Sequence, residues 1–216
     1  MKNRLTIAIQ KGGRLSDQSK DLIKKSGINF STKGDKLLAK SNNLPIDILF
    51  VRDDDIPSLV SNGDADLAIV GENVLIEKTL FKKNNTVKVL DLGFSKCRLS
   101  IAAPDNKKNM RLANKKIATS YPNILKKYLA DNNINATVTN IHGSVELTPY
   151  IGMSDCICDL VSSGATLEAN NLKEIKVILN SQAVLIKNKK LSKNKIVIAE
   201  KVINIFNKRI GKFFNK

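Results

Sequence analysis

Residues 156–166 read Cys-Ile-Cys-Asp-Leu-Val-Ser-Ser-Gly-Ala-Thr, an apolar stretch followed at once by small and polar residues. The apolar part, Cys156–Val161, predicts a buried strand. The Ser-Ser-Gly that follows predicts a tight turn into a helix that begins near Thr166. A strand, a turn and a helix in immediate succession are typical of α/β proteins. This stretch therefore predicts the fold class.

The same alternation continues on both sides of that stretch. Ser16 with Asp17 predicts a helix N-cap, and Pro57 suits the first turn of a helix that opens at residues 53–55. Strands are predicted at residues 5–9, 46–51, 67–70, 87–90, 98–103, 116–119, 137–141, 174–179 and 183–186, and helices at 16–25, from 53, from 71, at 122–132, at 145–151 and at the C-terminus.

The C-terminal helix is basic and amphipathic. Val202, Phe206, Ile210 and Phe213 recur at helical spacing and share one face. This pattern favours a helix docked on a sheet with solvated lysines, and a helix lying on a membrane surface is the alternative.

The order of these elements predicts two α/β lobes with mixed sheets and a central cleft, a plan similar to the type II periplasmic binding proteins. We expect domain I to comprise residues 1–94 and 181–216, and domain II to comprise residues 95–180 with the Ser-Ser-Gly loop. A ligand is expected in the cleft. A non-catalytic solute-binding module shares this plan, but such proteins are exported and the N-terminus has no export signal.

Composition excludes several classes of function. No apolar run is long enough to cross a bilayer, so we expect no membrane association and a cytoplasmic location. Three cysteines and a single histidine, His142, argue against disulfides, a zinc site and a nucleophile activated by histidine. The formal net charge of +16 suggests nucleic-acid binding, but only six of the 36 basic residues are Arg. A chain-wide lysine bias is the simpler explanation, and we expect no specific nucleic-acid partner and no protein-bound metal cluster.

The Ser-Ser-Gly turn carries the clearest chemistry. Hydroxyl groups and backbone N–H groups can converge there on one anion, and Gly164 lets the backbone turn without a β-carbon in the way. Asp159 would repel a phosphate but can accept hydrogen bonds from sugar hydroxyls. The stretch thus fits a ribose 5-phosphate site, although a Ser-Ser-Gly turn before a helix, taken alone, is more often a plain helix cap.

The surrounding residues extend this pattern. Glu146, Gly152, Ser154, Ile157 and Leu167 have fixed spacings to the loop. Together with segments 10–16, 45–57, 66–73, 97–99 and 117–122, the arrangement resembles the ATP phosphoribosyltransferase family from about residue 4 to residue 187. The resemblance implies attack of a purine ring nitrogen of ATP on phosphoribosyl diphosphate, with release of diphosphate, as the first step of L-histidine biosynthesis. It also implies Mg²⁺ with the diphosphate.

The resemblance implies roles for particular residues. The catalytic residues are Lys11, Arg14 and Arg52, near the diphosphate or the phosphates of ATP, while Arg98 and Glu72 bind ATP. Glu146 is also explained as an acid at a helix start. The phosphoribosyl group is bound by Glu146, Asp159, Ser162, Ser163, Gly164, Ala165 and Thr166.

The sequence departs from the family in three respects. The turn at Gly12-Gly13 is unusually rich in glycine, Asn171 stands where glycine is expected, and the chain ends before the regulatory domain of long members. It is therefore a short form or a fragment of a long form. Short forms act with a regulatory subunit resembling histidyl-tRNA synthetase, whereas the segments around Gln10 and Arg52 resemble long forms. We expect a homo-oligomer, which in a short form would also contain such a regulatory subunit.

Overall fold

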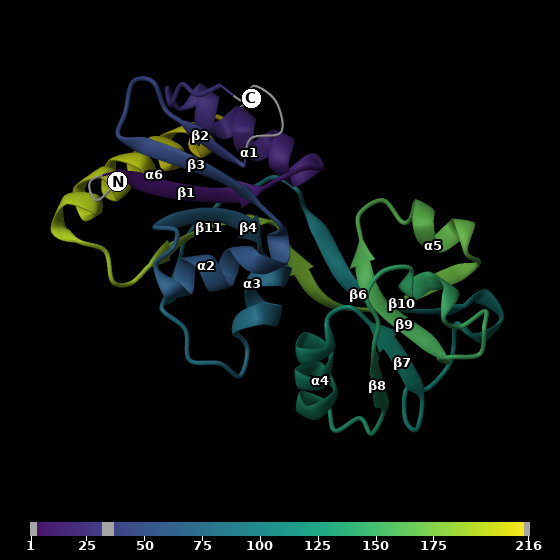
Figure 1. The fold of residues 1–216 in the computed structure, drawn as a ribbon. Coiled ribbons are helices and arrows are strands. Elements are labelled where there is room, and N and C mark those ends of the chain that lie inside the picture. Colours follow the sequence, from purple (N-terminus) through teal and green to yellow (C-terminus); the bar gives the residue numbers. More distant parts are fainter. Residues whose placement is uncertain (1–3, 32–36, 214–216) are drawn as a thin grey trace. The chain divides into compact units, whose positions relative to one another are not determined.

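The chain forms two compact units in a computed structural model that describes residues 4–31 and 37–213, with side chains to residue 210 (Figure 1). Unit 1 comprises Met1–Ser95 and Gln182–Lys216, and unit 2 comprises Lys96–Ser181. These limits lie next to the domain boundaries expected from the sequence. The ligand cleft expected between the domains stays a prediction.

Unit 1 is built on a six-stranded mixed sheet. Strand β1 is parallel to β3 and β4, whereas β11 is antiparallel to β4 and β5. The short edge strand β2, antiparallel to β3, was not predicted from the sequence. The sheet order is β2 (Leu38–Lys40), β3 (Ile46–Val51), β1 (Leu5–Gln10), β4 (Leu67–Gly71), β11 (Ala183–Asn188) and β5 (Thr86–Asp91).

Helices cover both faces of this sheet. Helices α1 (Arg14–Lys25) and α6 (Lys193–Phe213) lie on one face, and α2 (Ile56–Asn62) and α3 (Glu72–Thr79) lie on the other, as Figure 1 shows. The alternation of strand side chains explains both layers. Ile7 and Ile9 pack in the cluster that contains Phe206 of α6, whereas Ala8 packs in the cluster that contains Val60 of α2.

The C-terminal helix docks on the sheet, as its periodicity predicts. Val202 and Phe206 are buried, and Ile210 packs against the same core. The side chain of Phe213 lies outside the described residues. Among the described residues, no helix is both long enough and apolar enough to cross a membrane.

Helix α1 begins at Arg14, so the prediction that Ser16 caps it is wrong. Its N-cap is Gly13, which has a φ of +84° and makes no side-chain cap hydrogen bond. Glycine adopts this left-handed conformation without a steric penalty, and the chain therefore enters the helix before it reaches Ser16. Ser16 instead lies buried in the first turns of the helix.

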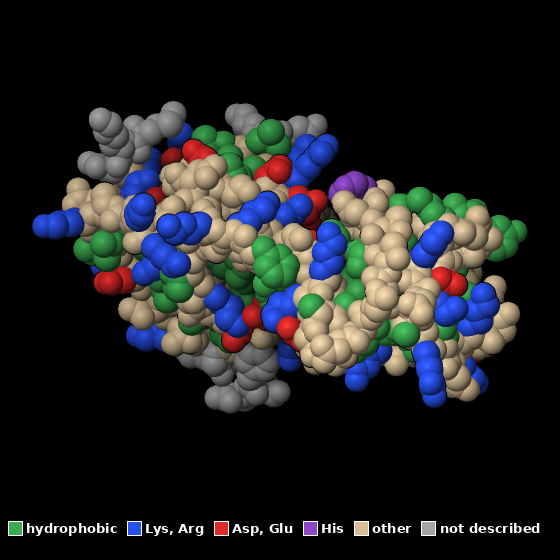
Figure 2. Space-filling model, turned by 90° about the horizontal axis from the view of Figure 1, so that it is seen from below, with side chains coloured by type: hydrophobic (Ala, Val, Ile, Leu, Met, Phe, Trp, Pro, Cys, Tyr) green, Lys and Arg blue, Asp and Glu red, His purple; other side chains and the backbone are tan. Residues whose placement is uncertain are grey.

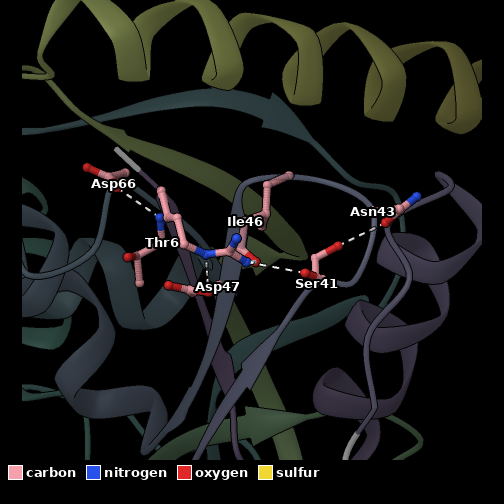
Figure 3. Close-up of polar contacts among 7 residues, drawn as sticks. Thr6, Ser41, Asn43, Ile46, Asp47 and Asp66 are labelled. Carbon is pink, nitrogen blue, oxygen red and sulfur yellow. Dashed lines mark hydrogen bonds and ion pairs between the residues drawn. The ribbon is translucent and has the colours of Figure 1, made fainter. Parts of the chain in front are cut away.

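A polar network fixes the amino-terminal ends of the central strands (Figure 3). The guanidinium of Arg4 donates to Asp47 Oδ1 at 2.8 Å and to the carbonyl oxygen of Ile46 at 2.6 Å. The N–H of Thr6 donates to Asp66 Oδ2 at 2.8 Å. Charge-assisted bonds of this kind hold the strand register. The register in turn determines which of the residues that follow β1, β3 and β4 lie side by side at the opposite, carboxyl edge of the sheet.

Unit 2 is built on a five-stranded mixed sheet. Strand β6 is antiparallel to β10 and β9, whereas β7 is parallel to β9 and β8. Helix α4 (Pro122–Asp131) contacts β8, and the short α5 (Ala165–Ala169) contacts β10. The sheet order is β10 (Leu172–Ser181), β6 (Cys97–Pro104), β9 (Cys156–Val161), β7 (Lys116–Thr119) and β8 (Thr137–Asn140).

The helix predicted over residues 145–151 is wrong. The chain makes only a three-residue 3₁₀ turn, η3 (Val145–Leu147), followed by turns. Proline has no backbone N–H, so Pro149 cannot donate the helical hydrogen bond to the carbonyl oxygen of Val145. The hydroxyl of Thr148 donates to the carbonyl oxygen of Val145 at 2.7 Å and lies 2.8 Å from Ser154 Oγ. These local side-chain hydrogen bonds take the place of the backbone N–H to carbonyl bonds of an α-helix.

Candidate active site

A pocket of about 140 Å³ opens in unit 2 where strand β9 ends. The loop between β9 and α5 forms one wall, and η3 contributes Glu146 to the lining. Of the residues predicted to bind a phosphoribosyl group, only Ala165 is outside the lining. The full lining is Glu146, Asp159, Leu160, Val161, Ser162, Ser163, Gly164, Thr166 and Leu167.

Two buried residues anchor the loop at its ends. Val161 precedes it and Leu167 follows it, and both pack in one apolar cluster with Ala102 and Ile157. Between these anchors the hydroxyl-bearing residues of the loop are exposed. The apolar anchors therefore fix the path of a loop whose polar groups remain accessible.

Gly164 determines the shape of the loop. It is the N-cap of α5 with a φ of +94°, and a β-carbon added there would meet no atom within 4 Å. The backbone conformation, not crowding by neighbours, therefore requires glycine. The first N–H groups of a helix have no acceptor within it. One of them, the N–H of Ala165, donates to Ser163 Oγ at a long 3.4 Å.

Burial and a neighbouring charge affect the ionisation of Asp159 in the pocket. Burial raises the pKa of Asp159, the nearby charge of Glu146 raises it further, and the hydrogen bond from the N–H of Leu160 to Asp159 Oδ1, 2.8 Å long, opposes the rise. An ionised carboxylate in this position lacks solvation that hydroxyl donors of a ligand can supply. The pocket thus offers hydroxyl and N–H donors at the loop and acceptors at Asp159 and Glu146.

Arg98 lies in the same unit, at the start of β6 and opposite Val161 in the sheet. Its Nε donates to Glu174 Oε2 at 2.7 Å, and its Nη1 donates to the carbonyl oxygen of Ser162 at 3.4 Å. Glu174 was not predicted from the sequence, because an ion pair between residues far apart in the chain leaves no local pattern. The predicted role of Arg98 in ATP binding stays a prediction.

The predicted catalytic cations gather at the carboxyl edge of the sheet in unit 1. Lys11 follows β1 and Arg52 follows β3, and the N–H of Lys11 donates to the carbonyl oxygen of Val51 at 2.7 Å. Arg14 begins α1 just beyond Lys11. All three residues are exposed. The parallel pairing of β1 with β3 therefore brings Arg52 to the segment that carries Lys11 and Arg14, and the catalytic roles of these residues stay predictions.

Glu72 lies at the same edge, because it follows β4 and begins α3. Its Oε1 accepts a hydrogen bond from Lys88 Nζ at 2.8 Å, and Asp91 Oδ1 accepts another at 3.0 Å. These two bonds raise the pKa of Lys88. The carboxylate of Glu72 is thus already engaged by a cation, and its role in ATP binding stays a prediction.

The thiol of Cys156 is buried in strand β9. Burial raises the pKa of the Cys156 thiol to about 12, so this thiol stays protonated at neutral pH. Within residues 4–31 and 37–210, no group of three or more His, Cys, Asp and Glu side chains is arranged to hold a metal ion.

The basic side chains are spread over the surface. Figure 2 shows Lys and Arg scattered over the visible face of both units, interrupted by apolar and neutral groups. A nucleic-acid site gathers basic residues into one patch or stripe. The face in view therefore agrees with a general lysine bias.

Comparison with known proteins gives the family. Residues 52–211 match the family model described as HisG, ATP phosphoribosyltransferase. An ATP phosphoribosyltransferase from Cytophaga hutchinsonii is 50% identical over 205 residues, which cover 92% of this chain and 69% of that protein. The chain belongs to the ATP phosphoribosyltransferase family. The resemblance inferred from the sequence motifs is therefore confirmed.

Solved structures agree with this assignment. A chain of the ATP phosphoribosyltransferase HisG:HisZ complex from Thermotoga maritima is similar with a TM-score of 0.78 and 28% identity, over 94% of this chain and 98% of that one. The GluR0 ligand-binding core with L-glutamate has a TM-score of 0.62 at 12% identity, over 97% and 96% of the two chains. This second likeness concerns the fold alone. It confirms the predicted likeness to type II periplasmic binding proteins.

Membership of the ATP phosphoribosyltransferase family defines the reaction. The enzyme is a pentosyltransferase that transfers the 5-phosphoribosyl group from phosphoribosyl diphosphate to a purine ring nitrogen of ATP, with release of diphosphate. This transfer is the first step of histidine biosynthesis. The reaction predicted from the motifs is confirmed at the level of the family.

Proposed function

We propose that the pocket in unit 2 is the part of this ATP phosphoribosyltransferase that binds the ribose 5-phosphate portion of phosphoribosyl diphosphate. The supporting observation is that one pocket is lined by both the Ser162–Ser163–Gly164 turn and the carboxylates of Asp159 and Glu146. Hydroxyl and N–H donors suit a phosphate, and carboxylates suit ribose hydroxyls.

In this proposal the raised pKa of Asp159 reflects a site prepared for its ligand. An ionised carboxylate that is partly desolvated gains free energy when ligand hydroxyls donate to it. The same charge repels a phosphate, which favours the end of the pocket formed by Ser163, Gly164 and Thr166. The sugar is therefore expected to bind in one orientation, with its 5-phosphate at the loop.

We further propose that Lys11, Arg14 and Arg52 stabilise the charge on the diphosphate or on the phosphates of ATP. Transfer from phosphoribosyl diphosphate passes through a cation-like sugar and needs no covalent nucleophile, so the protein contributes mainly positioning and charge. The exposure of these three residues at one edge of a sheet supports that role. Glu72, at the same edge, and Arg98, on unit 2, are retained as candidates for ATP binding.

We propose Mg²⁺ as the divalent ion of this reaction. Mg²⁺ binds through one or two carboxylates together with substrate phosphates, and keeps several waters. Asp159 and Glu146 are two carboxylates in one pocket, which fits that mode without a dedicated protein cage. Bound to the diphosphate, Mg²⁺ would neutralise the charge of the leaving group.

We also propose that the chain assembles with copies of itself and with a regulatory subunit resembling histidyl-tRNA synthetase. The support is its similarity to a chain of the HisG:HisZ complex from Thermotoga maritima. A cytoplasmic location belongs to the same proposal.

The binding site can be tested with ribose 5-phosphate as the probe. In a titration followed by the backbone amide signals, we expect the largest shifts at residues 162–167. The activity assay follows formation of the ring-substituted adenine by ultraviolet absorbance with ATP, phosphoribosyl diphosphate and Mg²⁺, with and without a candidate regulatory subunit. Amide shifts confined to other regions of the chain would contradict the proposed site.

The catalytic cations are tested by substitution. We expect Lys11→Met and Arg52→Met each to lower kcat about 100-fold, the scale of one lost charge stabiliser, while ribose 5-phosphate binding is kept. Lys127→Met is the matched control, because Lys127 forms an exposed helix pair with Asp131 at 2.8 Å on unit 2. Near-normal kcat in both cation variants would contradict their role.

A further inference from the structure

The guanidinium of Arg98 joins the start of the proposed phosphate loop to a distant strand. Its Nε donates to Glu174 Oε2 on β10 at 2.7 Å, and its Nη1 donates to the carbonyl oxygen of Ser162 at 3.4 Å. Arg98 itself is on β6, so three segments of unit 2 meet at one side chain. Neither Arg98 nor Glu174 is in the lining of the pocket.

The contact at Ser162 affects the next amide of the loop. The carbonyl oxygen of Ser162 and the N–H of Ser163 belong to one planar peptide, and no described peptide is cis. In a trans peptide these two groups point in opposite directions. A donor that holds the carbonyl oxygen therefore also fixes the direction of the Ser163 N–H, and Ser163 does line the pocket.

We propose that Arg98, held in place by Glu174, is a positioning residue that orients the Ser162–Ser163 peptide so that the Ser163 N–H can bind the 5-phosphate. This inference rests on the proposed ribose 5-phosphate site. Arginine suits the task because its planar fork presents separate N–H donors in fixed directions, one for the carboxylate and one for the carbonyl oxygen. Lysine offers a single ammonium, which cannot reproduce that geometry.

The role of Glu174 separates positioning from direct phosphate binding. If Arg98 bound the phosphate itself, removal of the acid that pairs with it would free a cation and strengthen anion binding. If Arg98 acts through the Ser162 carbonyl oxygen, removal of Glu174 lets the guanidinium leave that oxygen, and binding weakens. The two readings thus predict opposite signs for one substitution.

The experiment measures the Kd of ribose 5-phosphate by calorimetry for the wild type, Glu174→Ala, Glu174→Gln and Arg98→Lys. We expect Glu174→Ala and Arg98→Lys to raise the Kd about fivefold, the scale of one hydrogen bond. Glu174→Gln keeps an acceptor for Nε, and it should stay within about twofold of the wild type. The amide signal of Ser163 in the ligand-free protein should move in the two weakened variants and remain in place in Glu174→Gln.

Asp131→Ala is the matched control, since it also removes the acid of an ion pair on unit 2 and should leave the Kd unchanged. An unchanged or lower Kd in Glu174→Ala would overturn the positioning role, provided that the wild type binds the probe at residues 162–167. A wild type that does not bind ribose 5-phosphate there would overturn the proposed site itself. The two failures are therefore distinguishable.

Discussion

Glu146 and Asp159 line one pocket, and the charge of Glu146 adds to the burial that raises the pKa of Asp159. The two residues come from different local structures, the turn η3 and the end of strand β9. An acid with a raised pKa costs the folded protein stability in its ionised form. Ionised Asp159 is therefore unfavourable in the folded protein without a ligand, and hydrogen bonds from ligand hydroxyls would offset that cost.

Asp159→Asn should stabilise the protein and impair catalysis. Because the folded pKa lies above the unfolded one, ionised Asp159 destabilises the folded state at neutral pH, and stability contributed by its proton is lost as pH rises through the folded pKa. Asparagine carries no charge, so Tm at pH 7 should rise. Loss of an acceptor for ribose hydroxyls should lower kcat/KM about 10- to 100-fold. A lower Tm at pH 7 would contradict the conclusion that ionised Asp159 destabilises the folded protein.

Glu146→Gln should move the acid limb of the pH profile of kcat/KM to lower pH. In the proposed site, ribose hydroxyls donate to ionised Asp159, and removal of the neighbouring negative charge lowers the pKa of that acid. Burial remains, so the pKa stays above its ordinary value. The control is Glu168→Gln, which alters an exposed acid of α5. A limb that stays in place in Glu146→Gln, or moves equally in the control, would refute the coupling.

Gly164→Ala should weaken substrate binding at the loop much more than it lowers the stability of the fold. A φ of +94° costs a residue with a β-carbon about 1–2 kcal/mol, and the relief of that strain would rotate the amides that we propose bind the 5-phosphate. We expect kcat/KM to fall about 100-fold. Gly63→Ala is matched in strain, with a φ of +88° at the end of α2. Its kcat/KM should stay normal while its free energy of unfolding falls similarly.

Asp66→Asn should destabilise unit 1 without changing the chemistry. Asp66 Oδ2 accepts hydrogen bonds from the N–H of Thr6 at 2.8 Å and from Lys195 Nζ at 2.7 Å, and the residue is buried. We expect a loss of about 2 kcal/mol in the free energy of unfolding, measured by urea denaturation. Asp21→Asn breaks an exposed pair with Lys25 and should cost less than about 0.5 kcal/mol. Equal losses of unfolding free energy in the two variants would show that the hydrogen bonds of Asp66 do not stabilise the strand ends.

Asn171 illustrates a sequence departure that the backbone explains. It stands where the family pattern has glycine, and its φ is +53° just after α5 ends. Helices commonly end with a residue in this left-handed region, where asparagine is the best tolerated residue after glycine. The departure therefore preserves the geometry of the helix end and leaves the phosphate loop intact.

The sequence by itself determined the elements and the chemistry that depend on neighbouring residues. The strand Cys156–Val161, the turn at Gly164 and the helix after it follow from apolar runs, glycine and hydroxyl residues adjacent in the chain. Tertiary structure decided what distant residues do together. Glu174 meets Arg98 only through the pairing of β10 with β6, and Lys11 and Arg52 follow neighbouring strands only because β1 is parallel to β3. Strand pairing and register are set by the whole core, so no local pattern encodes these contacts.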